Sequence, residues 1–491
     1  MPSLTGVRTG GARATDGFSS VLEHQREAFR CDGPPSLKQR RADLAKLKQA
    51  VKASANRIAD VISADFGSRS RHESLMAEVL TVCTSIRHAS HWLPCWMRPK
   101  RVSVNLELRP GGARILYQPV GVVGIIAPWN YPFLLTIMPL VSALAAGNRV
   151  MLKPSERTPR TAQFIADLLA DLFAPEQVTT VLGDRDVGAE FSRLPFDHLF
   201  YTGSTAVGRE IMRAAAENLT PVTLELGGKS PCILGADVML PGAIESILYG
   251  KLVNAGQSCI APDYVLLPVG MREQFIRVAG EAVNRMYPTI SNNPDYTSIV
   301  DDNHYRRIVR YVEEARASGA RVIEFAPASE VSGTNERKLP PTLVVEPGDD
   351  LALMHDEIFG PVLPIKTYSR IDEAIDYVNR RPRPLALYYF GENKEERSEV
   401  LRRTISGGAS VNETLMHALV EELPFGGIGA SGMGAYHGES GFQTFSHRKG
   451  VFQQSRFNLL WMLRPPFTRA TDGLIRLLLM RSNRPRGLEC S

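Results

Sequence analysis

Apolar residues recur along the first hundred positions at the spacing of amphipathic helices. In residues 34–66 the apolar positions repeat at intervals of 3, 4 and 7 residues, at Leu37, Leu44, Leu47, Val51, Ile58 and Val61. Residues 21–29 and 73–96 carry the same kind of pattern. The sequence therefore predicts a helical N-terminal region, which follows a polar, Gly-rich segment at 1–17 that is expected to be a flexible leader without a secretory signal.

From about residue 115, short apolar runs alternate with helical patterns. The runs typical of buried strands are ILYQPVGVVGIIAP, RVMLKP, VTTVLG, HLFYTG, TPVTLELGG and SPCILG. Helical patterns such as TAQFIADLLADLF and GREIMRAAAENL lie between them, and a second α/β stretch follows Cys259. This alternation predicts an α/β fold built on parallel sheets. Two Gly-punctuated segments, RVSVNLELRPGGARILYQP and LPFGGIGASG, are expected to leave these layers as an extended excursion.

The segment after Phe452 combines apolar clusters with seven arginines. A basic amphipathic segment of this kind can lie on an anionic membrane. The alternative, which we favour, is a tail that packs on its own protein or on a second subunit. No window approaches the roughly 18 uninterrupted apolar residues of a membrane-spanning helix, so no such helix is expected.

The composition excludes several classes of protein. Of the 491 residues, 44% are hydrophobic and 22% are charged, which excludes wholesale disorder, collagen-like repeats and a polytopic membrane protein. A net charge of +5, from 57 basic and 52 acidic residues, is too weak to indicate a nucleic-acid partner. The six cysteines form no CxxC pair and no zinc-like set with histidine, so we expect no metal and a reducing compartment, the cytoplasm.

Three polar residues in apolar or Gly-rich surroundings are candidates for catalysis. Cys259 lies in NAGQSCIAPDY, where small residues let the backbone approach a ligand, and a cysteine thiolate is a nucleophile. Glu225 lies in the strand-like TPVTLELGGKSP, where burial raises a carboxyl pKa toward that of a general base. Asn130 follows a strand in IIAPWNYPF and can donate to an oxyanion. Each residue alone also fits a structural role, as a buried cysteine, an ion-paired acid or a helix cap.

A second set of residues has the character of a nucleotide site. In FYTGSTAVGREIM a strand, a Gly-rich turn and a helix follow one another, and the amides at such a helix N-terminus favour phosphate, although the glycines lack the GxGxxG spacing. Lys153 and Glu156 follow a strand and suit ribose or phosphate. In HDEIFGPVLPI, Glu357 and Phe359 face the same side of an extended segment. Taken singly, these residues fit solvated loop positions equally well.

Together these segments resemble the aldehyde dehydrogenase superfamily. The matching pieces are PWNYP, KPSERTP, FYTGSTAVG, LELGGKSP, GQSCIAP, EIFGPV and PFGGIGASGMGAYHG, which occur in the family's order over roughly residues 115–450. The spacing of 34 residues between Glu225 and Cys259 also fits the family. The ending SGMGAYHG…FSHRKGV resembles the class 3 and fatty-aldehyde branch, and the front half is similar to bacterial coniferyl aldehyde dehydrogenases.

The resemblance implies an aldehyde dehydrogenase-like architecture and a homodimer. It consists of an NAD-binding α/β domain, a catalytic α/β domain and a small bridging β element through which subunits associate. The expected ranges are 1–17 for the leader, 18–103 and 119–225 for the NAD-binding domain, 226–410 for the catalytic domain, 104–118 and 411–452 for the bridging element, and 453–491 for the tail. The two bridging segments are expected to pair as strands.

The resemblance also implies the chemistry. The Cys259 thiolate would attack the aldehyde carbon, and the Asn130 amide with the Cys259 backbone N–H would stabilise the thiohemiacetal oxyanion. After hydride transfer, Glu225 would deprotonate the water that releases the acid from the thioester. NAD is the expected cofactor, because Glu156 would repel an added 2′-phosphate, and NADP is the alternative. The cofactor contacts are assigned to Lys153, Glu156, Gly203, Ser204, Thr205, Gly208, Glu357 and Phe359.

The expected substrate is coniferyl aldehyde or a related aromatic aldehyde, and this expectation follows from the resemblance alone. Trp129, Tyr131 and His437 are candidates for an aromatic-friendly pocket or, equally, packing residues. An alternative is a fatty or medium-chain aldehyde dehydrogenase held at membranes by its basic tail. A non-catalytic relative is disfavoured by the intact catalytic set, and a CoA-acylating enzyme is disfavoured by Glu225.

Overall fold

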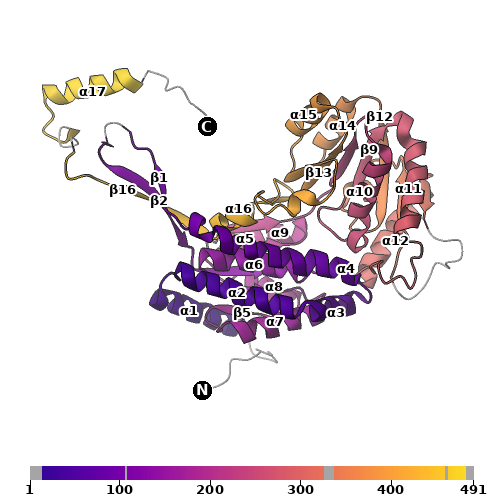
Figure 1. Ribbon diagram of the computed structural model, residues 1–491, viewed down its shortest axis with the longest axis horizontal. Helices are drawn as coiled ribbons and strands as arrows, with labels where there is room; N and C mark the ends of the chain where they lie inside the picture. Colours follow the sequence, from indigo (N-terminus) through magenta and orange to yellow (C-terminus); the bar gives the residue numbers. More distant parts are fainter. Residues whose placement is uncertain (1–13, 106–107, 326–336, 459–462, 483–491) are drawn as a thin grey trace.

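The computed structural model describes residues 14–105, 108–325, 337–458 and 463–482. Two large sheets with helices packed on them form the body of the molecule, and a narrow three-stranded sheet projects from it (Figure 1). Both large sheets are mostly parallel, so the predicted α/β fold is confirmed. The first 13 residues of the expected leader, and residues 459–462 and 483–491 of the expected tail, lie outside the described residues.

The first large sheet has six strands in the order β15-β7-β6-β3-β4-β5. Their bounds are β3 (Val122–Ile126), β4 (Arg149–Lys153), β5 (Val178–Thr180), β6 (His198–Thr202), β7 (Val222–Glu225) and β15 (Gly432–Met433). All neighbours are parallel except β15, which is antiparallel to β7. Ile126 pairs with Lys153 and Thr202 pairs with Glu225, so the carboxyl ends of these strands meet at one edge. In open α/β sheets that edge is where ligands bind.

The helices of this half begin earlier, and are more divided, than the sequence pattern indicates. They are α1 (Ala14–Asp32), α2 (Leu37–Ala53), α3 (Ala55–Phe66), α4 (Arg71–Glu73), α5 (Thr81–Trp96), α6 (Leu134–Ala146), α7 (Pro159–Leu172), α8 (Arg185–Ser192) and α9 (Thr205–Ala216). The helix expected over 34–66 is interrupted at Ser54, and a π-helical turn at Ser74–Leu80 lies between α4 and α5. Since α1 starts at Ala14, helix occupies the last four positions of the expected leader.

The second large sheet has seven strands in the order β10-β11-β12-β9-β8-β13-β14. Its strands are β8 (Pro231–Leu234), β9 (Tyr264–Pro268), β10 (Arg321–Glu324), β11 (Thr342–Val345), β12 (Val362–Tyr368), β13 (Ala386–Phe390) and β14 (Gly408–Val411). The helices of this half are α10 (Leu240–Leu252), α11 (Arg272–Met286), α12 (Asp302–Ala317), α13 (Ala352–His355), α14 (Ile371–Asn379) and α15 (Lys394–Arg403). One apolar cluster includes Ile137 of α6, Leu248 of α10 and Tyr388 of β13, so the two halves share a core.

The projecting sheet joins segments that lie far apart in the chain. It consists of β1 (Lys100–Val102), β2 (Gly112–Pro119) and β16 (Ser446–Gln453), and β16 runs antiparallel to the whole of β2. The expected pairing of the two bridging segments is therefore present, but only from Ser446 onward. The earlier part of 411–452 contains the last residue of β14, adds β15 to the six-stranded sheet and forms α16 (Gly438–Thr444).

The described part of the tail forms α17 (Arg469–Ser482), which lies beyond the projecting sheet and away from the two α/β halves (Figure 1). Several of its apolar side chains are exposed, among them Ile475, Leu479 and Met480. In the described part of the chain, no helix is both long and apolar enough to cross a membrane.

Candidate active site

Asn130 lies in the turn between β3 and α6, at the carboxyl edge of the six-stranded sheet. It is 3% exposed, and its side-chain Nδ2 donates to the backbone carbonyl of Gln257 at 3.1 Å. Gln257 belongs to the other half of the molecule, two residues before Cys259. An amide nitrogen carries two N–H donors, so one is left for a ligand. The bond therefore holds the amide of Asn130 beside the cysteine.

Cys259 follows a strained turn. Asn254, Ala255 and Gly256 have φ angles of 52°, 51° and 76°, in the left-handed region where a non-glycine residue costs roughly 1–3 kcal/mol. Two contacts hold the turn, because the Gln257 side chain donates to the Asn254 carbonyl at 2.9 Å and the Asn254 side chain donates to the Gln257 carbonyl at 3.1 Å. The turn ends α10 abruptly and leaves Cys259 partly accessible between buried neighbours.

Glu225 is the last residue of β7 and is almost fully buried, with 2% of its surface exposed. Neither carboxyl oxygen has a hydrogen-bond partner among the described residues. Burial raises the pKa of this carboxyl well above its ordinary value. A buried carboxyl without a partner is a strong base once it has lost its proton, and functional sites are where such groups gather.

The thiol and its neighbouring carboxyls are electrostatically linked. Burial, followed by the charges of Glu357 and Glu225, raises the pKa of Cys259 to about 12. Burial and the charge of Asp263 raise the pKa of Glu357 to about 8. Each of these pKa shifts favours the protonated form of its group. When ionised, the two carboxyls whose charge reaches the thiol are the natural acceptors of its proton.

The loop that carries Glu357 and Phe359 packs against both catalytic segments. A Cβ at Gly227 would collide with the Glu357 carboxylate, and a Cβ at Gly256 would collide with the Gly360 carbonyl. Phe359, at φ 52°, places its ring 5.4 Å from that of Trp129. Oxygen Oε1 of Glu357 is buried without a partner, as suits a group that accepts a hydrogen bond from a ligand.

A cavity of about 710 Å³ opens at the carboxyl edge of the six-stranded sheet. Ligand cavities commonly measure roughly 300–1,000 Å³. Lys153 and Glu156 line it and form an ion pair of 2.7 Å in which Lys153 is 3% exposed at its side chain. Burial acts to raise the pKa of Glu156, but the hydrogen bond and charge of Lys153 outweigh it and lower that pKa. Glu156 therefore presents a carboxylate to any ligand in the cavity.

The turn before α9 forms another wall of this cavity, which Gly203 and Ser204 both line. The Ser204 hydroxyl accepts from the Val207 N–H and so caps α9. Thr205 bonds instead to the carbonyl of Ala430 at 3.1 Å. A Cβ at Gly208 would crowd Leu226, so this glycine lies in helix–strand packing rather than on the cavity wall.

Comparisons with known proteins identify the family of this chain. The model of the aldehyde dehydrogenase family matches residues 13–451. The chain belongs to the aldehyde dehydrogenase family. The predictions of an enzyme and of NAD(P)-dependent aldehyde oxidation are thereby confirmed.

Individual relatives are similar in sequence or structure to this aldehyde dehydrogenase over most of its length. It is 47% identical to the coniferyl aldehyde dehydrogenase of Pseudomonas sp. (strain HR199 / DSM 7063), over 97% of this chain and 99% of the relative. It is 40% identical to aldehyde dehydrogenase family 3 member A2 of Macaca fascicularis, over 88% of both chains. The solved substrate-bound structure of Staphylococcus aureus AldH superimposes with a TM-score of 0.89 at 36% identity, covering 94% of this chain and 99% of that one. The predicted resemblance is thus confirmed.

The three substrate candidates of this aldehyde dehydrogenase occupy different places. Trp129 lines the cofactor-sized cavity against Phe359. Tyr131 follows Asn130 in the chain, and the Arg69 guanidinium lies 4.8 Å from the centre of its ring. His437 is 6% exposed and stacks on Phe425 with ring centroids 5.0 Å apart, so it serves packing in this arrangement.

Other residues of the site were not predicted from the sequence. Tyr436 is buried, and burial together with the charges of Glu225 and Cys259 raises its pKa. Glu73 accepts from the Asn254 N–H at 2.9 Å and so holds the strained turn. The sequence offers no local signal for Glu73, because its partner lies 181 residues away.

Proposed function

We propose that this aldehyde dehydrogenase oxidises coniferyl aldehyde or a related aromatic aldehyde to the carboxylic acid, with NAD as cofactor. The similarity to the Pseudomonas coniferyl aldehyde dehydrogenase extends over nearly the full length of both chains and supports this substrate class. The lower identity to family 3 member A2, 40% against 47%, gives the fatty-aldehyde alternative less support.

The reaction is carried by groups of the chain itself. The Cys259 sulfur adds to the aldehyde carbon, and its proton passes to a neighbouring carboxylate. The Asn130 amide and the Cys259 backbone N–H donate to the oxyanion of the thiohemiacetal. Loss of hydride from that carbon leaves a thioester on Cys259. Glu225 then takes a proton from water, which adds to the thioester carbon, and the carboxylic acid leaves as the thiol reforms.

Of the expected cofactor contacts, Lys153, Glu156, Gly203 and Ser204 line the cavity. Lys153 and Glu156 would hold the adenosine ribose, Gly203 and Ser204 the pyrophosphate, and Glu357 the nicotinamide ribose. Thr205 and Gly208 would act by shaping the turn, and Phe359 would lie against the nicotinamide. When bound, NAD supplies the hydride acceptor. The buried, unpartnered Oε1 of Glu357 and the carboxylate of Glu156 both suit ribose hydroxyl donors.

One observation carries the proposal: the Asn130 amide is bonded to the loop of Cys259, within electrostatic range of a buried carboxyl that has no hydrogen-bond partner among the described residues. A panel of coniferyl, cinnamyl, benzyl and C6 to C16 aliphatic aldehydes tests it, with NADH absorbance as the readout and Cys259→Ala as the blank. We expect the highest kcat/KM for coniferyl or cinnamyl aldehyde. A preference for long aliphatic aldehydes would refute the aromatic assignment, and NADH formation by Cys259→Ala would refute the nucleophile.

The assembly and location also belong to the proposal. We expect a homodimer in which the projecting sheet and α17 contact the second subunit, because Phe467 and Met480 are each 66% exposed in this part of the chain. Light scattering on the full chain and on a chain ending at residue 453 tests this: the shortened chain should lose the dimer, and an unchanged mass would exclude α17 from the interface. The sparse cysteines favour the cytoplasm.

A further inference from the structure

Arg69 and Glu78 form an ion pair closed off from solvent. Nη1 of Arg69 lies 2.7 Å from Oε1 of Glu78, and both side chains are 0% exposed. The guanidinium is also held between two rings, 5.0 Å from the centre of Phe66 and 4.8 Å from that of Tyr131. Desolvating two ions costs several kcal/mol each, and their attraction offsets this only when further hydrogen bonds complete the pair. The role of this ion pair is therefore to be sought in the hydrogen bonds that its two side chains make to other residues.

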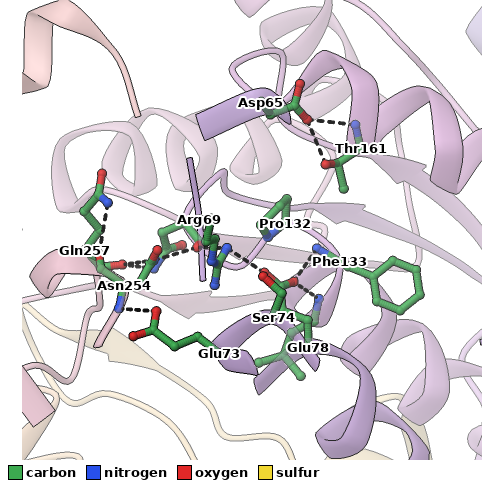
Figure 2. Close-up of polar contacts among 12 residues, drawn as sticks. Asp65, Arg69, Glu73, Ser74, Glu78, Pro132, Phe133, Thr161, Asn254 and Gln257 are labelled. Atoms are coloured by element: carbon green, nitrogen blue, oxygen red, sulfur yellow. Dashed lines mark hydrogen bonds and ion pairs between the residues drawn. The ribbon is translucent and has the colours of Figure 1, made fainter. Parts of the chain in front are cut away.

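The hydrogen bonds of the two side chains to other described residues go to the turn that carries the proposed oxyanion donor, and Figure 2 shows the bond from Phe133 of that turn. Nη1 of Arg69 donates to the backbone carbonyl of Asn130 at 3.1 Å. Oxygen Oε2 of Glu78 accepts from the N–H groups of Phe133 and Leu134, at 2.8 and 2.9 Å, and so caps the start of α6. The ion pair thus holds both ends of the turn from Asn130 to Leu134 by hydrogen bonds.

A chain of bonds leads from Arg69 through the other half of the molecule and back. The Ser298 N–H donates to the carbonyl of Ser68, next to Arg69, at 2.9 Å. The Gln257 side chain donates to the carbonyl of Ser298 at 3.1 Å. The Gln257 carbonyl accepts the Asn130 amide at 3.1 Å, and the Asn130 carbonyl accepts Arg69. These hydrogen bonds form a closed circuit that includes the Asn130 amide and the loop of Cys259. The distance between these two groups sets the catalytic geometry.

We propose that Arg69, fixed by Glu78, is a positioning residue for the oxyanion donor: it holds the backbone of Asn130 so that the side-chain amide faces the carbonyl oxygen of an aldehyde bound at Cys259. This inference rests on the proposed function, because it requires Asn130 to be the donor. A displacement of about 1 Å in such a group costs about 100-fold in rate. The pair would therefore act on the transition state and leave cofactor binding unchanged.

Arg40 provides a matched control at the opposite end of the same helix. It is 4% exposed and donates to the carbonyls of Ala145 and Ala146 at 2.9 and 2.7 Å, at the end of α6 far from Asn130. Arg40→Met removes a buried guanidinium and its hydrogen bonds to backbone carbonyls, as a change at Arg69 does. It should lower the melting temperature while kcat/KM stays within twofold of the unchanged enzyme.

The central test is a double-mutant cycle between the ion pair and Asn130. In Arg69→Met with Glu78→Leu, apolar side chains replace the pair, a change that often preserves stability. We expect kcat/KM for the aldehyde to fall about 10- to 100-fold, with KM for NAD and melting temperature close to those of the unchanged enzyme. In an Asn130→Ala background the same replacement should change kcat/KM less than twofold, since the group it positions is gone.

Other results would overturn the inference. Full kcat/KM in the folded pair replacement, or an equal loss in the Asn130→Ala background, would show that Arg69 does not act through Asn130. If the replacement does not fold, Arg69→Lys takes its place in the cycle, because its ammonium keeps the charge near Glu78 but ends one bond short of Nη1. Failure of the proposed function has a different signature, since Asn130→Ala alone would then retain full kcat/KM.

Discussion

The side-chain amide of Asn130 donates to the backbone carbonyl of Gln257 at 3.1 Å, and this bond joins the two halves of the active site. Asn130 lies in the turn after β3 in one half, and Gln257 belongs to the loop of Cys259 in the other. Neither residue depends on the substrate for its position. The donor is thus oriented before any aldehyde arrives, which is the condition under which an oxyanion contact is most effective.

The first prediction concerns this amide. Asn130→Asp keeps the shape of the side chain but removes both N–H donors and adds negative charge. We expect kcat/KM to fall about 10²- to 10³-fold, measured by NADH formation at fixed NAD. Asn148→Asp is the control, because Asn148 is also buried and its amide donates to the carbonyl of Phe445 at 2.8 Å. Equal losses in both variants would mean that the effect is one of folding.

Glu225→Gln separates the two halves of the reaction. The amide has the same volume but takes up no proton, so the thioester should form and then hydrolyse about 10²- to 10⁴-fold more slowly. Stopped-flow absorbance should show a burst of one NADH per active site before a slow steady state, and mass spectrometry should find the acyl group on Cys259. Glu281→Gln, on the exposed face of α11, should behave as the unchanged enzyme. A normal steady state in Glu225→Gln would remove Glu225 from the hydrolytic step.

The reactivity of Cys259 should depend steeply on pH. Burial and the nearby carboxyls raise its pKa to about 12, so the reactive thiolate fraction grows about tenfold for each pH unit between 7 and 9. Alkylation by iodoacetamide, followed on the Cys259 peptide by mass spectrometry, should show this slope in the protein without NAD. Cys95 is exposed and provides an internal comparison. A rate at Cys259 that levels off below pH 9 would contradict the raised pKa.

Much of the fold was predictable because it depends on local pattern. The short apolar runs from GVVGIIAP to SPCILG contain β3 to β8, since buried parallel strands have continuous apolar sequences. The segment ILYQP, also expected to be a buried strand, belongs instead to β2, which is antiparallel to its neighbours and mostly half-buried. The break at Ser54 was not predictable, because the apolar spacing continues across it while the backbone does not. The short β15 was missed because two residues, Gly432 and Met433, carry no strand pattern of their own.

The site divides in the same way. The strand ends that carry Glu225 and Lys153 follow from sequence periodicity. Local surroundings indicated the other main candidates, such as Cys259 and Asn130, and the resemblance implied their roles. No role could be predicted for Arg69 and Glu78 from the sequence, although they form the buried ion pair beside Asn130. Their importance arises from contacts across 55 and 61 positions of the chain, which no local pattern encodes.

Cofactor choice should respond to Glu156. Its carboxylate, paired with Lys153 at 2.7 Å, lies on the wall of the cavity and would repel a 2′-phosphate. In Glu156→Gln we expect kcat/KM for NADP to rise about tenfold, which corresponds to about 1.4 kcal/mol, with a smaller change for NAD. Glu210→Gln tests the effect of another acid on the cavity wall and should change neither value. An unchanged NADP/NAD ratio in Glu156→Gln would show that this carboxylate does not select the cofactor.

Glu73 should make the stability of the enzyme depend on pH. It is 8% exposed, and burial raises its pKa from 4.5 to about 7, although the Asn254 N–H and the charge of Arg69 act to lower it. Between these two values the folded chain binds more protons than the unfolded chain, so the free energy of unfolding falls as pH rises through that window. The loss amounts to about 3 kcal/mol at pH 8.

Glu73→Gln removes this titration while its amide oxygen can still accept from the Asn254 N–H. Urea denaturation at pH 5, 6, 7 and 8 should therefore give a flatter curve for Glu73→Gln than for the unchanged enzyme, with the variant relatively more stable at pH 8. Glu421→Gln serves for comparison, because burial also raises the pKa of Glu421 to about 7 but its partner is Ser85, away from the strained turn. It should flatten the curve to a similar extent without changing kcat. Parallel curves for Glu73→Gln and the unchanged enzyme would show that Glu73 keeps an ordinary pKa and carries its charge into the core.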